Sequence, residues 1–165
     1  HIHPMDKSTR TIFGDAGAAT LVCECEGSIG EFDLGTDGSG KDMLIIKSPQ
    51  DNLYMNGVDI FNFTIRVVPK SVKNILNKHN LSLDDIDLFV FHQANKFMLD
   101  YLQKKLKIPT DKFYVNMQDI GNTVSATIPI ALKRAEDEGK LHKGDKVLLV
   151  GFGVGLSWGS TIITY

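Results

Sequence analysis

Short apolar runs that alternate with longer amphipathic stretches are the feature that most limits how this chain can fold. The run Leu88–Phe91 is apolar throughout and is bounded by acidic and polar residues, which predicts a buried strand. Elsewhere apolar residues recur every three or four positions, as in a helix with one buried side. Such alternation is typical of α/β folds. The predicted strands are residues 18–26, 29–35, 88–91, 113–115, 146–152 and 157–165, and the predicted helices are residues 58–80, 96–107 and 123–138.

The longest predicted helix contains a proline. Pro69 removes one backbone donor and crowds the preceding turn. We therefore expect a kink, or a break into two helices near Arg66, rather than a straight helix. Before this helix, the stretch from Thr36 to about Asn56 is rich in Gly, Asp, Ser and Asn and has no period, which predicts a loop.

Two polar residues are placed where an α/β sheet could use them for chemistry. His92 directly follows the buried strand, and the carboxyl ends of strands are where such sheets keep their sites. Asn122 follows another short strand and precedes a helical pattern, so it should lie on an accessible loop or helix start. An imidazole and a carboxamide from two loops can bind one oxyanion. The alternative for His92 is a hydrogen-bonded structural residue.

A glycine-flanked turn joins the last two predicted strands. Gly153 and Gly155 allow backbone angles that are closed to other residues and let the chain approach a ligand closely. The alternative is a simple hairpin turn between two strands. The sequence alone leaves both interpretations open.

The composition is that of an ordinary folded domain. At 165 residues the chain is long enough to bury a core, and 42% of it is hydrophobic. Eighteen basic and twenty acidic residues give a net charge of -2, and no basic patch is present, which argues against a nucleic-acid partner. No apolar stretch approaches the roughly 18 residues that span a bilayer, and the first residues lack the features of a signal peptide, so we expect no membrane association.

The only cysteines are Cys23 and Cys25. Residues 18–26 end in alternating apolar and acidic positions, which predicts a half-buried strand with both thiols on one face. We interpret the pair as packing residues, with metal binding or a disulfide as the alternatives, since such neighbours are poorly placed for a bridge. Two cysteines without a secretion signal favour reduced thiols and a cytoplasmic location.

Five segments resemble one family in their order and spacing. The family is 3-oxoacyl-acyl-carrier-protein synthase III, the thiolase-fold condensing enzyme that starts fatty acid synthesis. The resemblance is to its C-terminal half and extends over nearly all of this chain. The segments are His92–Asn95, Gly121–Thr123, Gly151–Gly159, Phe13–Ala19 and Met55–Gly57.

The resemblance implies a decarboxylative Claisen condensation. In that family a Cys in the N-terminal half carries the acyl group, and no matching Cys is present here. We therefore expect this chain to be the second half of a larger enzyme and to be inactive alone. A malonyl thioester loses carbon dioxide, and hydrogen-bond donors stabilise the enolate oxygen that results. By position these donors would be His92 Nε2, the Asn122 amide and, in the oxyanion hole, the backbone N–H of Val154.

The resemblance also implies substrate-binding positions. Asn95 and Gly57 match positions that contact pantetheine, although Asn95 is equally placed to be the N-cap of the following helix. Phe152 and Lys96 are further candidates. The family often has an Arg where this chain has Phe97. Docking of an acidic carrier protein would then fall to Lys96, or the substrates would be coenzyme A thioesters.

The implied fold is α/β, a thiolase-like αβα layered structure with a five-stranded mixed sheet. Residues 1–56 would be the tail end of the N-terminal half and residues 57–165 the C-terminal ketoacyl synthase III domain. No metal or other cofactor is implied, because coenzyme A or phosphopantetheine thioesters are substrates. The implied partners are acyl carrier protein and a second copy in a homodimer. The alternatives are another thiolase-fold acyltransferase, polyketide-synthase-like or hydroxymethylglutaryl-CoA-synthase-like, and a non-catalytic partner subunit.

Overall fold

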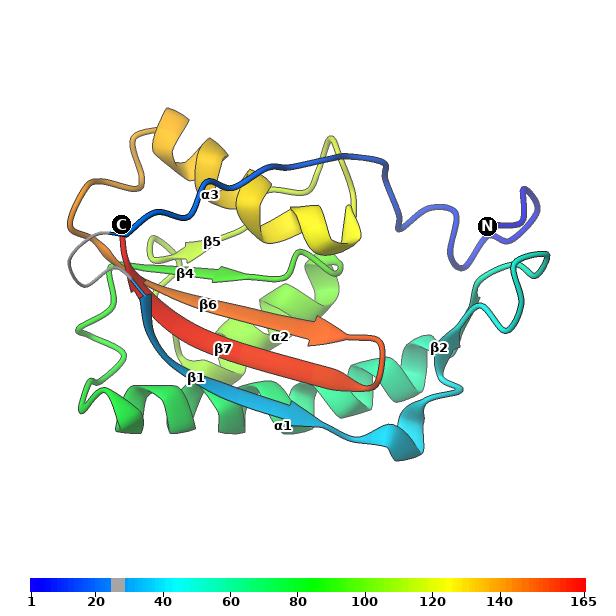
Figure 1. Ribbon diagram of the computed structural model, residues 1–165, viewed down its shortest axis with the longest axis horizontal. Coiled ribbons are helices and arrows are strands. Elements are labelled where there is room, and N and C mark those ends of the chain that lie inside the picture. Colours follow the sequence, from blue (N-terminus) through cyan, green and yellow to red (C-terminus); the bar gives the residue numbers. More distant parts are fainter. Residues whose placement is uncertain (25–28) are drawn as a thin grey trace.

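The computed structural model describes residues 1–24 and 29–165, and Figure 1 shows how their helices and strands are arranged. Every strand and helix predicted from residue 29 onward is present, with small shifts of boundary. The elements in chain order are β1 (Ile29–Thr36), the 3₁₀ helix η1 (Gly38–Gly40), β2 (Leu44–Ile45), β3 (Tyr54–Met55), α1 (Gly57–Lys78), β4 (Leu88–Phe91), α2 (Lys96–Leu106), β5 (Phe113–Tyr114), the 3₁₀ helix η2 (Val124–Ala126), α3 (Thr127–Asp137), β6 (Lys146–Gly153) and β7 (Ser157–Thr164).

A five-stranded mixed sheet organises the molecule, in the order β1-β7-β6-β4-β5. β4 is parallel to both of its neighbours, β5 and β6, whereas β7 is antiparallel to β6 and to β1. The predicted five-stranded mixed sheet is therefore confirmed. β1 precedes residue 57, so the sheet draws strands from both sides of the predicted domain boundary. The short strands β2 and β3 pair separately, within the segment that the sequence predicted to be a loop.

Helices cover both faces of the sheet. α1 and α2 lie on one face and α3 on the other, as Figure 1 shows. Successive side chains of a strand point to opposite faces, so β4 contributes to both cores. Phe89 and Phe91 pack with the residues of α1 and α2, whereas Leu88 and Val90 pack with those of α3. All four side chains are buried, which fixes β4 at the centre of the αβα layers.

The proline in α1 does not break the helix. The expected division near Arg66 is wrong, because the helix is continuous from Gly57 to Lys78. An ordinary residue at position 69 would donate its N–H to the Ile65 carbonyl, and Pro69 has no N–H to give. In its place, Lys105 of α2 donates from Nζ to the Ile65 carbonyl oxygen at 2.9 Å. A neighbouring helix therefore satisfies the carbonyl that the proline leaves free.

The strand predicted for residues 18–26 is not found in its described part. Residues 18–24 form no strand, and the side chains of Leu21, Val22 and Cys23 are exposed. A strand needs a neighbour to pair with its backbone, and no strand in residues 1–24 and 29–165 pairs with this segment. Cys25 lies outside the described residues, as does the predicted placement of both thiols on one face.

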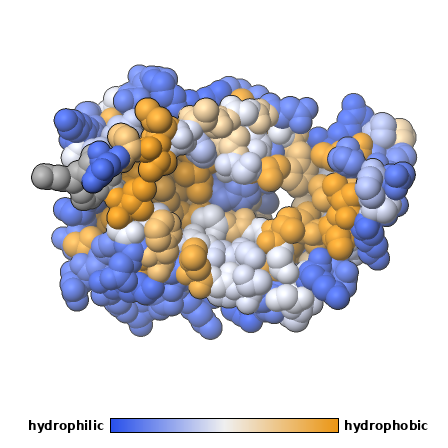
Figure 2. All heavy atoms as spheres, in the orientation of Figure 1, coloured by the Kyte–Doolittle hydropathy of each residue, from blue (hydrophilic) through white to orange (hydrophobic). Residues whose placement is uncertain are grey.

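Several large apolar side chains lie outside the core. Figure 2 shows separate hydrophobic patches on one face of the molecule, between hydrophilic residues. Contiguous exposed apolar surface commonly marks a contact with another polypeptide. The large apolar side chains that are more than half exposed include Leu21, Val22, Leu34, Val58, Phe97 and Val154. Across the part of the chain that the structure describes, no helix has both the length and the apolar character needed to cross a bilayer.

The contact between the two helices predicts a coupled stability effect. Lys105→Met should lower the free energy of unfolding by about 1 kcal/mol, because the Ile65 carbonyl loses its donor. In a Pro69→Ala background the same change should cost much less, since residue 69 then offers an N–H. Urea unfolding of the single and double variants measures this coupling, with the neighbouring Lys104→Met as the matched control. Equal losses in both backgrounds would contradict the explanation.

Candidate active site

His92 lies at the carboxyl end of strand β4, which lies between β6 and β5 in the sheet. Its backbone N–H donates to the Val150 carbonyl oxygen at 2.7 Å, which extends the pairing of β4 with β6 by one residue. Its ring packs edge-on against Phe152, with 5.3 Å between ring centroids. Its Nδ1 lies 2.7 Å from Thr127 Oγ1, at the start of α3. These contacts fix the ring and leave Nε2 as the nitrogen available to a ligand.

The direction of the Thr127 hydroxyl proton is coupled to the tautomer of His92. Its single hydroxyl proton lies between two acceptors, His92 Nδ1 and the Val124 carbonyl oxygen at 3.0 Å. When the hydroxyl donates to Val124, Nδ1 is the ring donor and Nε2 presents a lone pair. When it donates to Nδ1, Nε2 carries hydrogen and can donate to a substrate oxygen. Burial lowers the pKa of His92 to about 4, so the ring is neutral at neutral pH.

Asn122 is buried, and its amide is oriented by its own loop. Its Oδ1 accepts the backbone N–H of Val124 at 2.9 Å, which leaves Nδ2 as the donor end. Val124 has a φ of 55°, a left-handed conformation that is unusual for a β-branched residue. Strain of this kind costs about 1–3 kcal/mol and is concentrated at functional sites. The hydrogen bond from Val124, on this strained turn, holds the amide group in one orientation.

His92 and Asn122 line the same cavity, which has a volume of about 410 Å³. Of the seven site residues expected from the sequence, all except Lys96 line this cavity: His92, Asn122, Val154, Asn95, Gly57 and Phe152. Most of the remaining wall is apolar, and its side chains include Phe13, Leu44, Met55, Ile60, Met98 and Ile128. The structure thus joins in one cavity residues that the sequence places in separate segments.

Two helices begin at the cavity wall. Asn95 is the N-cap of α2, where its Oδ1 accepts the N–H of Met98 at 2.8 Å, so the capping role considered from the sequence is confirmed. Asn56 caps α1 in the same way, and Gly57 is the first residue of that helix. The N-terminus of a helix carries partial positive charge. The cavity wall therefore favours atoms with negative charge or partial negative charge.

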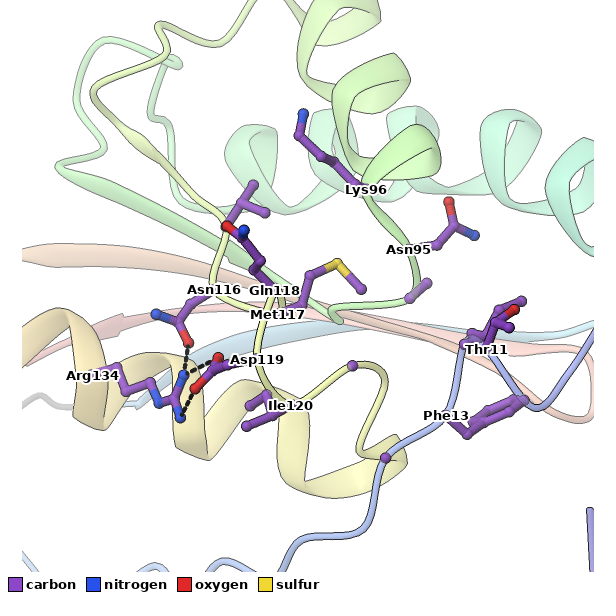
Figure 3. A pocket seen from close by; sticks show the side chains of 15 residues that line it. Thr11, Phe13, Asn95, Lys96, Asn116, Met117, Gln118, Asp119, Ile120 and Arg134 are labelled. Atoms are coloured by element: carbon purple, nitrogen blue, oxygen red, sulfur yellow. Dashed lines mark hydrogen bonds and ion pairs between the residues drawn. The ribbon is translucent and has the colours of Figure 1, made fainter.

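Lys96 faces a second and wider cleft, shown in Figure 3, with a volume of about 1400 Å³. This cleft lies between the N-terminal segment, residues 1–24, and the loop of residues 115–121. It shares Phe13 and Asn95 with the smaller cavity. Lys96 Nζ forms an ion pair with Asp100 at 2.6 Å on the exposed surface of α2. The structure therefore places Lys96 outside the cavity that holds His92 and Asn122.

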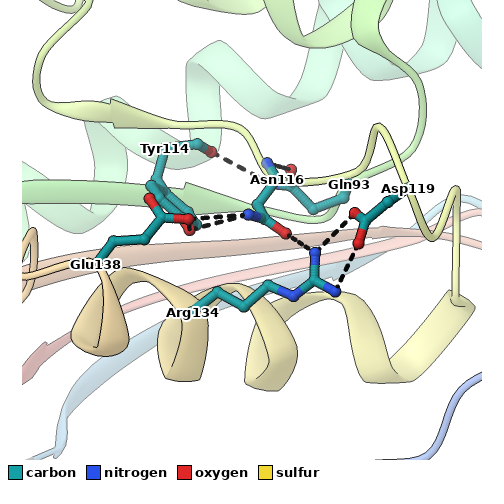
Figure 4. Close-up of polar contacts among 6 residues, drawn as sticks. All are labelled: Gln93, Tyr114, Asn116, Asp119, Arg134 and Glu138. Atoms are coloured by element: carbon teal, nitrogen blue, oxygen red, sulfur yellow. Dashed lines mark hydrogen bonds and ion pairs between the residues drawn. The ribbon is translucent and has the colours of Figure 1, made fainter.

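A polar network joins the two loops that carry His92 and Asn122 (Figure 4). Gln93 is buried, and its Oε1 accepts the backbone N–H of Asn116 at 2.8 Å. Asn116 Oδ1 accepts from Arg134 of α3 at 2.6 Å. Arg134 also forms a bidentate pair with Asp119 at 2.7 and 2.9 Å and holds the pKa of that carboxyl below its usual value. The loop that leads to Asn122 is thus attached to both β4 and α3.

Sequence reasoning missed Thr127 and the apolar wall of the cavity. A threonine five residues after Asn122, inside the predicted helix of residues 123–138, was the available signal for Thr127. Its contact with His92 depends on how α3 packs against β4, which no local pattern encodes. Phe13 carried a family resemblance, but nothing in the sequence placed it beside Asn122.

Acid should destabilise the folded chain through His92. The folded ring gains a proton only when the pH reaches its lowered pKa of about 4, whereas the unfolded ring gains one near 6.5. Below pH 6.5 protons therefore favour the unfolded chain, and the free energy of unfolding should fall by up to about 3 kcal/mol as the pH drops to 4. His92→Gln should remove most of this fall in urea unfolding at a series of pH values.

If His92→Gln keeps the pH dependence of the unsubstituted chain, the neutral ring of His92 is not the cause.

Comparison with known proteins gives the family. A family model described as 3-oxoacyl-[acyl-carrier-protein] synthase III C terminal matches residues 76–165, more than half of the chain. A β-ketoacyl-[acyl-carrier-protein] synthase III of Clostridium perfringens is 40% identical over 96% of this chain, and the match covers 53% of that protein. The chain spans about half the length of the curated relatives that it matches.

Solved structures agree with this result. The 3-oxoacyl-(acyl carrier protein) synthase III of Pseudomonas aeruginosa PAO1 matches with a TM-score of 0.88 and 34% identity, over 99% of this chain and 54% of that one. The priming β-ketosynthase of the R1128 polyketide pathway matches with a TM-score of 0.86 and 29% identity, over 98% of this chain and 52% of that one. The predicted thiolase-like fold is confirmed. The chain belongs to the 3-oxoacyl-[acyl-carrier-protein] synthase III family and corresponds to its C-terminal part.

Proposed function

We propose that this chain is the C-terminal half of a ketoacyl synthase III, which condenses an acyl thioester with malonyl-acyl carrier protein in fatty acid biosynthesis. One observation carries the proposal. A neutral imidazole and an oriented carboxamide, His92 and Asn122, share an apolar cavity with the turn residues Gly153 and Val154. An apolar wall with a few convergent polar groups is typical of a small-molecule site.

The proposed reaction needs donors for a developing negative charge. When the malonyl thioester breaks its bond to the carboxylate, carbon dioxide leaves and the bonding electron pair forms an enolate with charge on the thioester oxygen. Asn122 Nδ2 is suited to this oxygen because an amide donates without titrating. His92 Nε2 would be the second donor, with the Thr127 hydroxyl proton turned to Nδ1. One well-placed donor is worth roughly 3–4 kcal/mol of the barrier.

The enolate carbon then attacks the carbonyl carbon of the acyl group, and a thiolate leaves as the new carbon–carbon bond forms. We propose that this thiolate belongs to a Cys in the half of the relatives that this chain does not span. Cys23 does not fit the role, since it is exposed on the N-terminal segment and does not line the cavity. The nucleophile and the donors would thus come from different halves.

We propose that an acyl carrier protein or coenzyme A approaches over α2. Asn95 at the start of this helix lines the cavity, and beside it Phe97 stacks against Phe61 with 5.4 Å between ring centroids. Phe97 is 71% exposed, so this aromatic surface is open to a partner, and the adjacent Lys96 offers a positive charge. We also propose that the full-length enzyme is a cytoplasmic homodimer, and that its C-terminal domain begins at residue 57 of this chain.

A second candidate function is the priming step of a polyketide synthase. The similarity to the R1128 priming ketosynthase supports it, because that protein shares the fold over almost the whole chain. The two candidates use the same condensation chemistry and differ in the pathway that receives the product. A hydroxymethylglutaryl-CoA-synthase-like activity and a non-catalytic role have no observation of their own in their favour.

The test uses a fusion enzyme, made by joining the first half of the Clostridium perfringens relative to this chain. We expect it to transfer labelled acetyl from acetyl-CoA and to release carbon dioxide from malonyl-carrier protein. His92→Ala or Asn122→Ala should lower carbon dioxide release about 100-fold or more and change acetyl transfer much less. The unfused 165-residue chain should do neither.

Two controls make this test decisive. His142→Ala changes an exposed histidine and should leave both steps intact. Equal losses of acetyl transfer and carbon dioxide release in the Asn122→Ala enzyme would contradict the division of roles. Acetylation of the unfused chain at Cys23 or Cys25, with turnover, would do the same.

A further inference from the structure

The N-terminal segment holds the backbone of Asn122 from both sides. The Asn122 N–H donates to the Ile12 carbonyl oxygen at 2.8 Å, and the Gly14 N–H donates to the Asn122 carbonyl oxygen at 3.0 Å. Phe13 and Asn122 are thereby paired as in a parallel bridge. This segment lies far from Asn122 in the sequence but reaches the same cavity through Phe13. The chemistry proposed above gives it no role.

Two glycines make this approach possible. A Cβ on Gly14 would overlap the carbonyl oxygen of Ile120, just before Asn122. A Cβ on Gly121 would lie 2.8 Å from the carbonyl oxygen of Ile12, and Gly121 has a φ of 65°, which other residues rarely adopt. Each glycine therefore faces the backbone of the opposite segment. Gly17, in contrast, has no atom within 4 Å of an added Cβ.

The contacts of Asn122 account for three of its four polar groups. The N-terminal segment takes the backbone N–H and carbonyl, and the N–H of Val124 takes the side-chain Oδ1. The remaining group, Nδ2, is the one that can meet a ligand in the cavity. A shift of the backbone at Asn122 would therefore turn Nδ2 away from its present direction.

We propose that Ile12–Gly14 is a positioning element for Asn122, and that Gly14 is the residue that allows it to lie close enough. The element acts on the backbone and sets where Nδ2 points. The effect of this element on catalysis rests on the proposed function. Its effect on the position of Asn122 is a property of this chain alone and is tested separately.

Hydrogen exchange in the 165-residue chain tests the positioning. The Val124 amide reports the bond to Asn122 Oδ1. Gly14→Ala should speed exchange of the Val124 and Asn122 amides about tenfold or more and leave the amides of β6 unchanged. Gly17→Ala is the matched control and should change none of them. A purely structural role would instead raise exchange throughout the core.

A second variant removes the contact without adding an atom. The exposed Cys23 allows synthetic residues 1–22 to be ligated to residues 23–165, so an ester can replace the amide at Gly14 and delete its N–H. The chain with the ester should show the same faster hydrogen exchange at the Val124 and Asn122 amides. If Gly14→Ala does not fold, this chain alone tests the positioning of Asn122. Unchanged exchange at Val124 in either folded variant, or equal loss of protection in β6, would overturn the proposal.

A double-mutant cycle in the fusion enzyme tests the catalytic consequence. Gly14→Ala should lower carbon dioxide release about tenfold or more when Asn122 is present and have little effect in an Asn122→Ala background. Additive losses would show that Gly14 does not act through Asn122 and would overturn this consequence. If the unsubstituted fusion enzyme releases no carbon dioxide, the proposed function fails, and hydrogen exchange alone still decides the positioning.

Discussion

The buried side chain of Gln93 joins the two strands on which the site is built. Its Nε2 donates to the Phe91 carbonyl oxygen at 2.7 Å, and its Oε1 accepts the N–H of Asn116, beyond the end of β5. A buried amide that lost these partners would cost about 1–3 kcal/mol per unsatisfied group. The contact therefore fixes the carboxyl ends of β4 and β5 relative to each other. His92 precedes Gln93, and the loop after Asn116 leads to Asn122, so Gln93 supports the position of both residues.

The site combines rigid polar groups with an apolar wall, and the two properties support each other. The low polarity of the cavity keeps the His92 ring neutral and strengthens any hydrogen bond made to a substrate oxygen. A neutral ring donates from Nε2 in only one tautomer, and that tautomer requires the Thr127 hydroxyl to donate to Nδ1. Asn122 needs a defined direction, which its strained loop and the N-terminal segment supply. Donors that are fixed before the substrate arrives need no reorganisation during the reaction.

The sequence predicted the elements whose burial is local. The apolar run of β4, the stripe of α2 and the paired strands β6 and β7 were all placed within a few residues, because periodicity reports which side of an element is buried. The placement of His92 and Asn122 at loop starts was also accessible from sequence. Their meeting in one cavity was expected only from the family resemblance.

What the sequence could not predict depends on contacts between distant segments. Pro69 leaves the Ile65 carbonyl without a donor from its own helix, and Lys105 of another helix provides one. Residues 18–24 have the pattern of a strand but find no strand to pair with in the described part of the chain. The partnership of Thr127 with His92, and of Gly14 with Asn122, likewise arises only when the sheet brings these segments together.

A malonyl thioester is proposed to bind in the cavity between His92 and Asn122. This binding can be measured by an NMR titration of the 165-residue chain with a malonyl pantetheine analogue that has an amide in place of the thioester. Binding in this cavity should give saturable shifts of the Asn122 side-chain amide, the His92 ring and the backbone amides of Gly153 and Val154, all with one dissociation constant. Saturable shifts confined to the wide cleft around Asp119 and Arg134, with the signals of Asn122 and His92 unmoved, would contradict it.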